Sequence, residues 1–154
     1  MSYKQTSVAF QGYIPTTVNN VTGAGATPTL TGLTKVFDLA NNFNFTSGTF
    51  TAPVGGIYHF DATLTMSSLT APMNRGSCSL ILSSGIIILG QILNIGTVRD
   101  DLNEYTLILS ASTFLASSVT ATIQYQITGG ISDSASLEGA MGSFITNFSG
   151  FLVR

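Results

Sequence analysis

Residues 48–66, GTFTAPVGGIYHFDATLTM, decide the fold because apolar and polar side chains alternate strictly along their second half. Successive side chains of a strand point to opposite faces, so this alternation predicts a strand with one buried face. Pro53 precedes the strand, where no ladder donor is needed and proline is tolerated. The apolar positions of the predicted strand are Tyr58, Phe60, Ala62, Leu64 and Met66, and the polar positions between them are His59, Asp61, Thr63 and Thr65.

The rest of the chain repeats strand signals, whereas sustained helical periodicity is nearly absent. Ser83-Ser84-Gly85 predicts a tight hairpin between two apolar runs. Residues 15–34 form a long connection with room for a short edge strand, and residues 132–142 form a loop. This pattern predicts one all-β sandwich or barrel. Strands are expected at 7–14, 35–39, 43–45, 56–66, 77–82, 86–93, 104–110, 118–127 and 143–153.

Three motifs carry a resemblance to a known family, and they occur in the family's order. The central motif consists of Phe37, Asn42, Phe45, Gly48, Phe50, Pro53, Gly56, Tyr58 and Phe60. The last strand contains Phe148-Ser149-Gly150-Phe151-Leu152, and the first contains Val8-Ala9-Phe10. The chain therefore resembles the globular heads of the complement component one-q family, within the tumour necrosis factor-like superfamily.

The resemblance implies an antiparallel two-sheet jelly-roll sandwich of about ten strands that associates as a compact homotrimer. It covers residues 7–154, and residues 1–6 are expected to be a flexible N-terminal segment. The family often has Gly-Asp-x-Val before a late strand, whereas this chain has Ala116-Ser117-Ser118-Val119. The missing carboxylate removes the family's calcium contact at that point. No collagen-like Gly-x-y stalk is present in the sequence.

Charge and composition exclude several functions. Charged residues make up 8% of the chain, against about 25% in ordinary globular proteins. A subunit that covers part of its surface with copies of itself fits this low charge. The apolar stretch 86–95 is too short to span a bilayer, and Met1–Lys4 does not read as a signal peptide. Nucleic-acid binding is not expected, since the basic residues are scattered at Lys4, Lys35, Arg75, Arg99 and Arg154.

Few residues offer chemistry. His59 is the sole histidine, so any Ser-His-Asp catalysis would have to use it; a packed or partly exposed strand histidine is the favoured interpretation. Cys78 is the sole cysteine, which excludes an intrachain disulfide and favours a buried, inert thiol over an intermolecular bridge. The acidic cluster Asp100, Asp101 and Glu104 is either a solvated turn or a calcium site at the trimer apex. No other cofactor is expected.

We therefore expect a non-enzymatic, trimeric recognition head at a cell or virion surface or outside the cell, binding protein or glycan through loops. The candidate loops are 15–34, 67–76, 96–103 and 130–142, because ligands concentrate on loops held by a rigid scaffold. The alternative is a structural module that trimerises and caps a surface fibre, spore, phage or viral appendage. A hydrolase using His59 is the third hypothesis. The expected core comprises Phe10, Phe50, Tyr58, Phe60, Leu80, Leu107, Ile123, Phe148 and Phe151.

Overall fold

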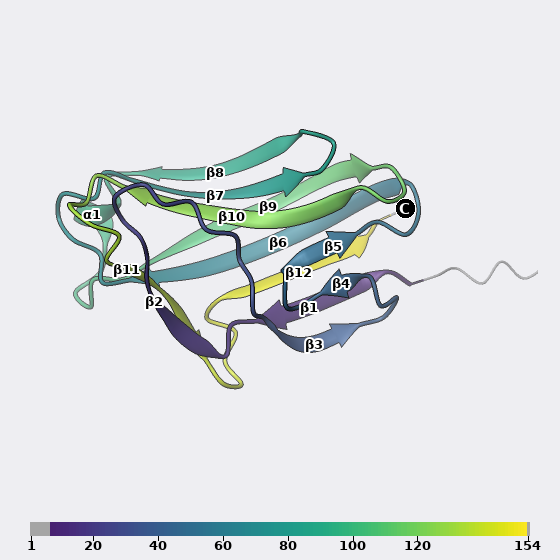
Figure 1. The fold of residues 1–154 in the computed structure, drawn as a ribbon, viewed down its shortest axis with the longest axis horizontal. Coiled ribbons are helices and arrows are strands. Elements are labelled where there is room, and N and C mark those ends of the chain that lie inside the picture. Colours follow the sequence, from purple (N-terminus) through teal and green to yellow (C-terminus); the bar gives the residue numbers. More distant parts are fainter. Residues whose placement is uncertain (1–6, 154) are drawn as a thin grey trace, which may run out of the picture.

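The computed structural model describes residues 7–153, so the predicted flexible segment 1–6 lies outside the described residues. Within the described range the chain forms twelve strands and one helical turn (Figure 1). The larger number of strands, against about ten expected, arises partly from short ones such as β4. The elements are β1 (Ala9–Tyr13), β2 (Thr16–Thr22), β3 (Thr34–Asp38), β4 (Phe43–Asn44), β5 (Thr49–Thr51), β6 (Gly56–Ser67), β7 (Arg75–Leu82), β8 (Ile87–Leu93), α1 (Ile95–Val98), β9 (Tyr105–Leu115), β10 (Thr120–Thr128), β11 (Ala135–Ala140) and β12 (Asn147–Leu152).

The strands build two antiparallel sheets, which confirms the all-β sandwich. The larger sheet runs β2-β11-β6-β12-β1-β3, with β9 on the other side of β6. The smaller sheet runs β4-β5-β10-β7-β8. The first and last strands are neighbours: Phe10 of β1 lies opposite Gly150 of β12. None of the described helical residues forms a segment long and apolar enough to cross a bilayer.

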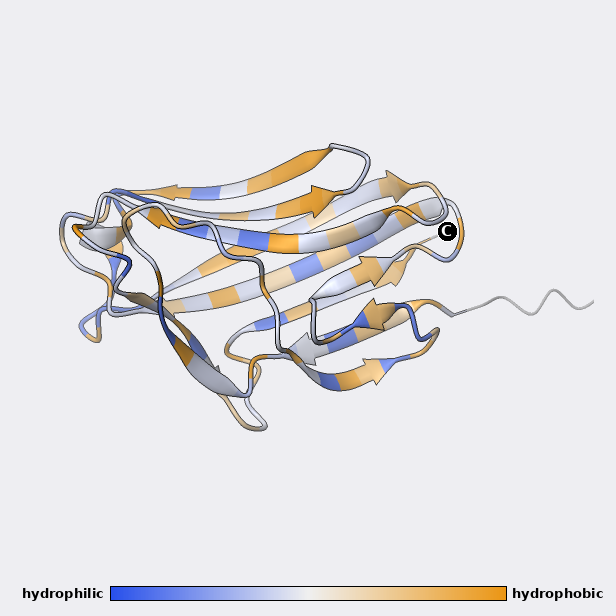
Figure 2. Ribbon diagram, in the orientation of Figure 1, coloured by the Kyte–Doolittle hydropathy of each residue, from blue (hydrophilic) through white to orange (hydrophobic). Residues whose placement is uncertain are grey.

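The core fills the space between the two sheets with aromatic rings. Apolar and polar residues alternate along the long strands (Figure 2), so each strand turns one row of side chains inward. The ring of Phe10 stacks on Phe43 with centroids 4.2 Å apart and on Phe50 at 5.2 Å. Phe148 meets the same ring edge-on at 5.1 Å. These buried rings are the main apolar anchors of the fold.

At two glycines of the family-like motifs, the surrounding atoms leave no room for a side chain. A Cβ on Gly150 would lie 2.7 Å from Phe60 and 2.8 Å from Phe10, so glycine lets the two rings pack over the strand. Gly48 has φ +68°, and a Cβ there would lie 1.8 Å from the carbonyl oxygen of Leu30. Both positions therefore require glycine.

Two sequence predictions are wrong in detail. The segment expected to be a loop at 132–142 contains β11, whose Ser- and Gly-rich sequence and irregular register hide its strand character. Its partner β2 is the short edge strand for which the connection 15–34 was expected to have room, so that expectation is confirmed. Phe151 is 46% exposed, although the other residues expected in the core are buried. In β12 the core positions are Phe148 and Gly150, so the period of two turns Phe151 outward.

Candidate interaction surfaces

The outer face of the larger sheet carries an exposed apolar surface built by β6, β9 and β12. Its large apolar side chains are Ile57 (39% exposed), Ile108 (67%), Phe114 (59%) and Phe151 (46%). The strand register makes Ile57 and Phe114 direct cross-strand neighbours. We call this surface, defined by these four residues and His59, the β6–β9–β12 face. Exposed apolar patches on protein surfaces are typical of contact sites.

A polar cluster sits at the centre of this face. His59 Nδ1 lies 2.8 Å from Ser112 Oγ, and Nε2 lies 3.1 Å from Asp61 Oδ2. Ser110 Oγ lies 3.3 Å from the same Nε2. The imidazole is 26% exposed and also lies against the Phe151 ring at a centroid distance of 5.4 Å. Serine, histidine and aspartate therefore meet here, on the polar side of the strand predicted from sequence.

The backbone on both sides of His59 is held within the larger sheet. β6 pairs with β9 on one side and β12 on the other, and His59 lies opposite Ser112 and Phe151 in those ladders. The backbone N–H groups next to His59 are therefore used within the sheet and cannot form an oxyanion hole. The cluster fits a polar centre within an apolar contact surface.

A second apolar surface lies along β8, the edge strand of the smaller sheet. Ile87, Leu89 and Leu93 are 64%, 56% and 62% exposed, and we call these three residues the β8 edge. Beside it, where the two sheets part, a cavity of about 190 Å³ lies between residues 90–92 of β8 and residues 105–108 of β9. A long, apolar, unpaired edge is normally covered in a folded protein.

Segments of all four predicted ligand loops lie at the end of the sandwich that holds α1 (Figure 1). Leu69 donates its backbone N–H to Asn103 at 3.1 Å, which joins the loops 67–76 and 96–103. Gly130 donates to Gly23 at 2.9 Å, which joins the β10–β11 loop to the turn after β2. Ile131 at the tip of the β10–β11 loop is 96% exposed. We call this end the α1 end.

The acidic residues predicted as a calcium site lie in the turn before β9. Asp100 Oδ1 accepts the backbone N–H groups of Leu102 at 2.9 Å and Glu104 at 2.8 Å, so Asp100 caps its own turn. Arg99 donates to Asn103, not to an acid. Within residues 7–153, no group of three His, Cys, Asp or Glu side chains that could hold a metal is found. The calcium site remains a prediction from sequence.

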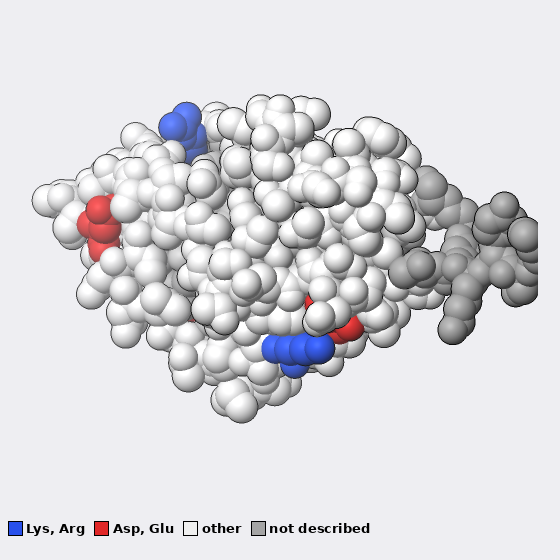
Figure 3. Space-filling model, turned by 45° about the vertical axis from the view of Figure 1, so that its right-hand side comes forward, with Lys and Arg blue, Asp and Glu red and all other residues white. Residues whose placement is uncertain are grey.

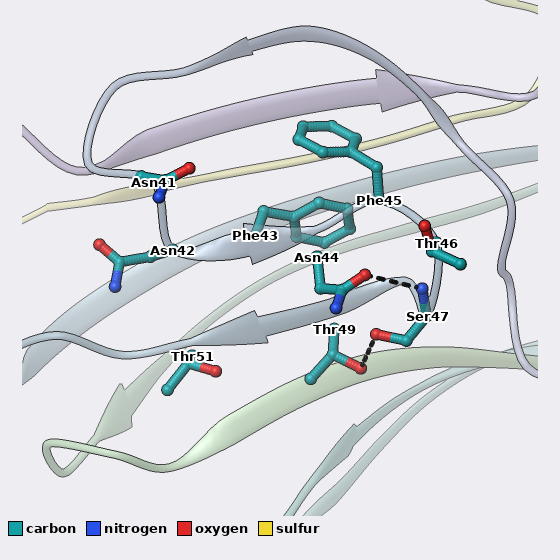
Figure 4. A pocket seen from close by; sticks show the side chains of 9 residues that line it. All are labelled: Asn41, Asn42, Phe43, Asn44, Phe45, Thr46, Ser47, Thr49 and Thr51. Atoms are coloured by element: carbon teal, nitrogen blue, oxygen red, sulfur yellow. Dashed lines mark hydrogen bonds between the residues drawn. The ribbon is translucent and has the colours of Figure 1, made fainter.

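Sequence reasoning missed one cavity, which lies over the β4–β5 hairpin (Figure 4). It has a volume of about 640 Å³ and is lined by amide and hydroxyl side chains and two phenylalanines. The close spacing of asparagine, threonine and serine in this segment was the available signal. Its lining residues are Asn41, Asn42, Phe43, Asn44, Phe45, Thr46, Ser47, Thr49 and Thr51.

Cys78 is buried, at 1% exposure, in β7. Burial raises the pKa of its thiol to about 12, which keeps the thiol protonated and unreactive near neutral pH. This agrees with the inert thiol expected from sequence.

The fold matches solved structures over nearly the whole chain. The globular domain of zebrafish complement 1qA is 17% identical and aligns with a TM-score of 0.61 over 96% of this chain and 98% of that chain. Murine APRIL at pH 5.0 is 7% identical, with 0.64 over 96% and 99%. Eiger TNF from S. frugiperda is 11% identical, with 0.64 over 97% and 94%. No family model and no curated protein matches the sequence.

At these identities the likeness concerns the fold. The chain has the jelly-roll fold of complement one-q and tumour necrosis factor-like domains, which confirms the resemblance seen in the sequence.

Proposed function

We propose that this chain is a non-enzymatic recognition head that assembles as a homotrimer outside the cell or on a cell or virion surface. Its ligand, a protein or a glycan, binds through exposed loops, foremost those of the α1 end. The observation that carries this proposal is the exposure of two different apolar surfaces on one chain, the β6–β9–β12 face and the β8 edge. The fold shared with complement 1qA and Eiger TNF is consistent with it.

The two surfaces explain why a ring is favoured over a symmetric dimer. The β6–β9–β12 face belongs to the larger sheet and the β8 edge to the smaller sheet. The β6–β9–β12 face of one copy can therefore contact the β8 edge of the next copy. A contact between unlike surfaces repeats around the assembly and closes when the rotation permits. Covering both surfaces removes exposed Phe114, Phe151 and Leu89 from water, at about 25 cal/mol per Å² of apolar area. The scarcity of charge suits such covering: Figure 3 shows a few charged side chains separated by wide uncharged areas.

Paired charge substitutions test this arrangement. Phe151→Asp places a charge on the β6–β9–β12 face and leaves the β8 edge unchanged. Leu89→Asp places a charge on the β8 edge and leaves the β6–β9–β12 face unchanged. Each variant alone is expected to be monomeric. In a mixture, the unchanged β8 edge of Phe151→Asp can bind the unchanged β6–β9–β12 face of Leu89→Asp. The two variants should therefore form a heterodimer, which native mass spectrometry detects. Thr46→Asp is the control and should remain trimeric, because Thr46 is exposed in the turn of the β4–β5 hairpin, at the opposite edge of the smaller sheet from β8.

Two results would contradict the proposal. If both variants assemble as the wild type does, neither surface is a contact. If each variant instead forms a homodimer through its intact surface, like surfaces contact each other and the ring arrangement is wrong.

The alternative, a structural module that caps a fibre or appendage, is favoured by the neutral outer side of the smaller sheet. There Thr122, Gln124 and Gln126 of β10 alternate with buried residues. In that case replacing the loops of the α1 end would leave function intact, whereas a recognition head would lose its ligand.

A further inference from the structure

The cavity over the β4–β5 hairpin is lined by a row of neutral polar side chains. Phe43 and Phe50 face the core and oppose each other, and Asn44 lies opposite Thr49. One step further along the hairpin, the backbone N–H of Thr51 donates to the carbonyl of Asn42 at 2.9 Å. The cavity is therefore lined by two amide–hydroxyl pairs on adjacent strands (Figure 4).

Part of this polar array is free to bind. Asn44 Oδ1 accepts the backbone N–H of Ser47 at 3.0 Å, and Ser47 Oγ donates to Thr49 Oγ1 at 3.0 Å. The side chains of Asn42 and Thr51 have no hydrogen-bond partner among residues 7–153, and both are half-buried. Their donors and acceptors line the cavity and are available to a ligand.

The polar side chains of the cavity lie on a hairpin that hydrogen bonds and core packing hold in place. Both oxygens of the Asp38 carboxylate accept backbone N–H groups at the start of the hairpin, from Asn42 at 3.1 Å and Phe43 at 3.0 Å. The ring of Phe43 stacks on Phe10 in the core at 4.2 Å, and Phe45 packs against Phe43 at 4.8 Å. A site held in place before binding loses less entropy when the ligand arrives.

The chemistry of the lining selects the class of ligand. Among residues 7–153, no carboxylate, lysine or arginine lines the cavity, so this part of the chain supplies neither the carboxylates typical of a calcium site nor the cations that hold phosphate or sulfate. The described lining also holds none of the Trp, Tyr and Arg anchors typical of protein hot spots. Neutral amides and hydroxyls pair with the hydroxyls of a sugar, each of which both donates and accepts.

We infer that the cavity over the β4–β5 hairpin is a binding site for a neutral carbohydrate. The inference rests on the recognition function proposed above and names the ligand class and a second site away from the α1 end. Its volume of about 640 Å³ falls in the usual range of small-ligand sites, about 300–1,000 Å³. The absence of a tryptophan from the sequence makes single-site binding weak, and the copies of a trimer would strengthen it through avidity.

An array of immobilised glycans tests the inference. The probes are neutral oligosaccharides ending in mannose, glucose, galactose or N-acetylglucosamine, with sialylated and sulfated glycans as charged comparators. Protein from a bacterial host avoids a covalent glycan on the Asn44-Phe45-Thr46 sequon. We expect the wild type to bind at least one neutral group and the charged comparators no better. Thr51→Val and Asn42→Ala should each weaken that binding about tenfold, which is roughly 1.4 kcal/mol.

Thr122→Val is the matched control, because it removes a half-exposed hydroxyl from the same sheet outside the cavity. It should bind as the wild type does. Binding of charged glycans alone, of proteins alone, or of neutral glycans with Thr51→Val and Asn42→Ala unaffected would overturn the inference. So would the absence of any neutral glycan binding. Light scattering on the same samples separates the two proposals: a trimer that binds no neutral glycan refutes the carbohydrate site alone, whereas a monomer also refutes the trimeric head.

Discussion

Phe151 of β12 lies directly opposite His59 of β6, with the two ring centroids 5.4 Å apart on the outer face of the larger sheet. Three residues earlier on the same strand, Phe148 is fully buried. One short phrase of sequence thus supplies an anchor for the core and an aromatic for the surface. The exposed ring, set beside the sole histidine, is the centre of the surface that we assign to self-association.

The two phenylalanines on opposite sides of the larger sheet should differ in their effect on stability. Phe60 is fully buried, and its ring centroid lies within 6.4 Å of four other aromatic rings. Phe60→Ala should lower the free energy of unfolding by roughly 3–5 kcal/mol. Phe151→Ala should cost a monomeric background far less, because its ring is 46% exposed. Urea unfolding of both variants in the Leu89→Asp background measures this, and equal losses would contradict the assigned inner face.

Gly48 and Gly142 form a matched pair for backbone strain. Their φ angles are +68° and +70°, but a Cβ on Gly142 meets nothing within 4 Å, whereas one on Gly48 meets the carbonyl of Leu30. Gly142→Ala should cost about 1–2 kcal/mol from the left-handed backbone alone. Gly48→Ala should cost clearly more, because the chain must also move. Thermal unfolding compares them, and similar melting temperatures would show that the hairpin moves freely.

The buried thiol should make stability depend on alkaline pH. Burial raises the pKa of Cys78 to about 12, whereas an unfolded chain loses this proton at about 8.5. The folded state therefore binds the proton more tightly, and the thiol's contribution is complete below about pH 8.5 and declines above it. Between pH 9 and pH 11, the wild type should lose more unfolding free energy than Cys78→Ala does. Parallel profiles would mean that the thiol is accessible in the folded state.

The turn before β9 allows capping to be separated from calcium binding. Asp100 holds two backbone N–H groups, so Asp100→Ala should lower stability by roughly 0.5–2 kcal/mol in the absence of calcium. Asp101 lies in the same turn and is exposed, so Asp101→Ala should be neutral without calcium. If the predicted site binds calcium, the ion raises the melting temperature of the wild type and not that of Asp101→Ala. The same rise in both proteins would exclude Asp101 as a ligand.

The sequence predicted the fold well wherever a strand had one buried and one solvent-exposed face. The alternation from Tyr58 to Met66 reappears as β6, with its apolar side fully buried. It failed where alternation is weak: β11 is Ser- and Gly-rich and shifts register against β2, so its sequence resembles a loop. The prediction also failed at Phe151, because an aromatic residue that points outward from a strand looks like a core residue in the sequence of a single chain.

The candidate surfaces were less predictable than the fold. Two polar partners of His59, Ser110 and Ser112, come from β9, far along the chain, and only strand pairing brings them beside it. Its third partner, Asp61, lies two residues away on β6. The β4–β5 cavity likewise depends on how a short hairpin is held by Asp38. The loops of the α1 end were predicted because turn-forming residues mark loops, and hydrogen bonds between them show which ones meet.

The most direct measurement is the solution mass by light scattering coupled to size exclusion, with and without a calcium chelator. We predict a trimer of about three times the 16.1 kDa chain, held by the β6–β9–β12 face and the β8 edge, with or without the chelator. A trimer that falls apart in chelator would instead assign its cohesion to calcium in the Asp100–Glu104 turn. A stable monomer would contradict the trimeric head.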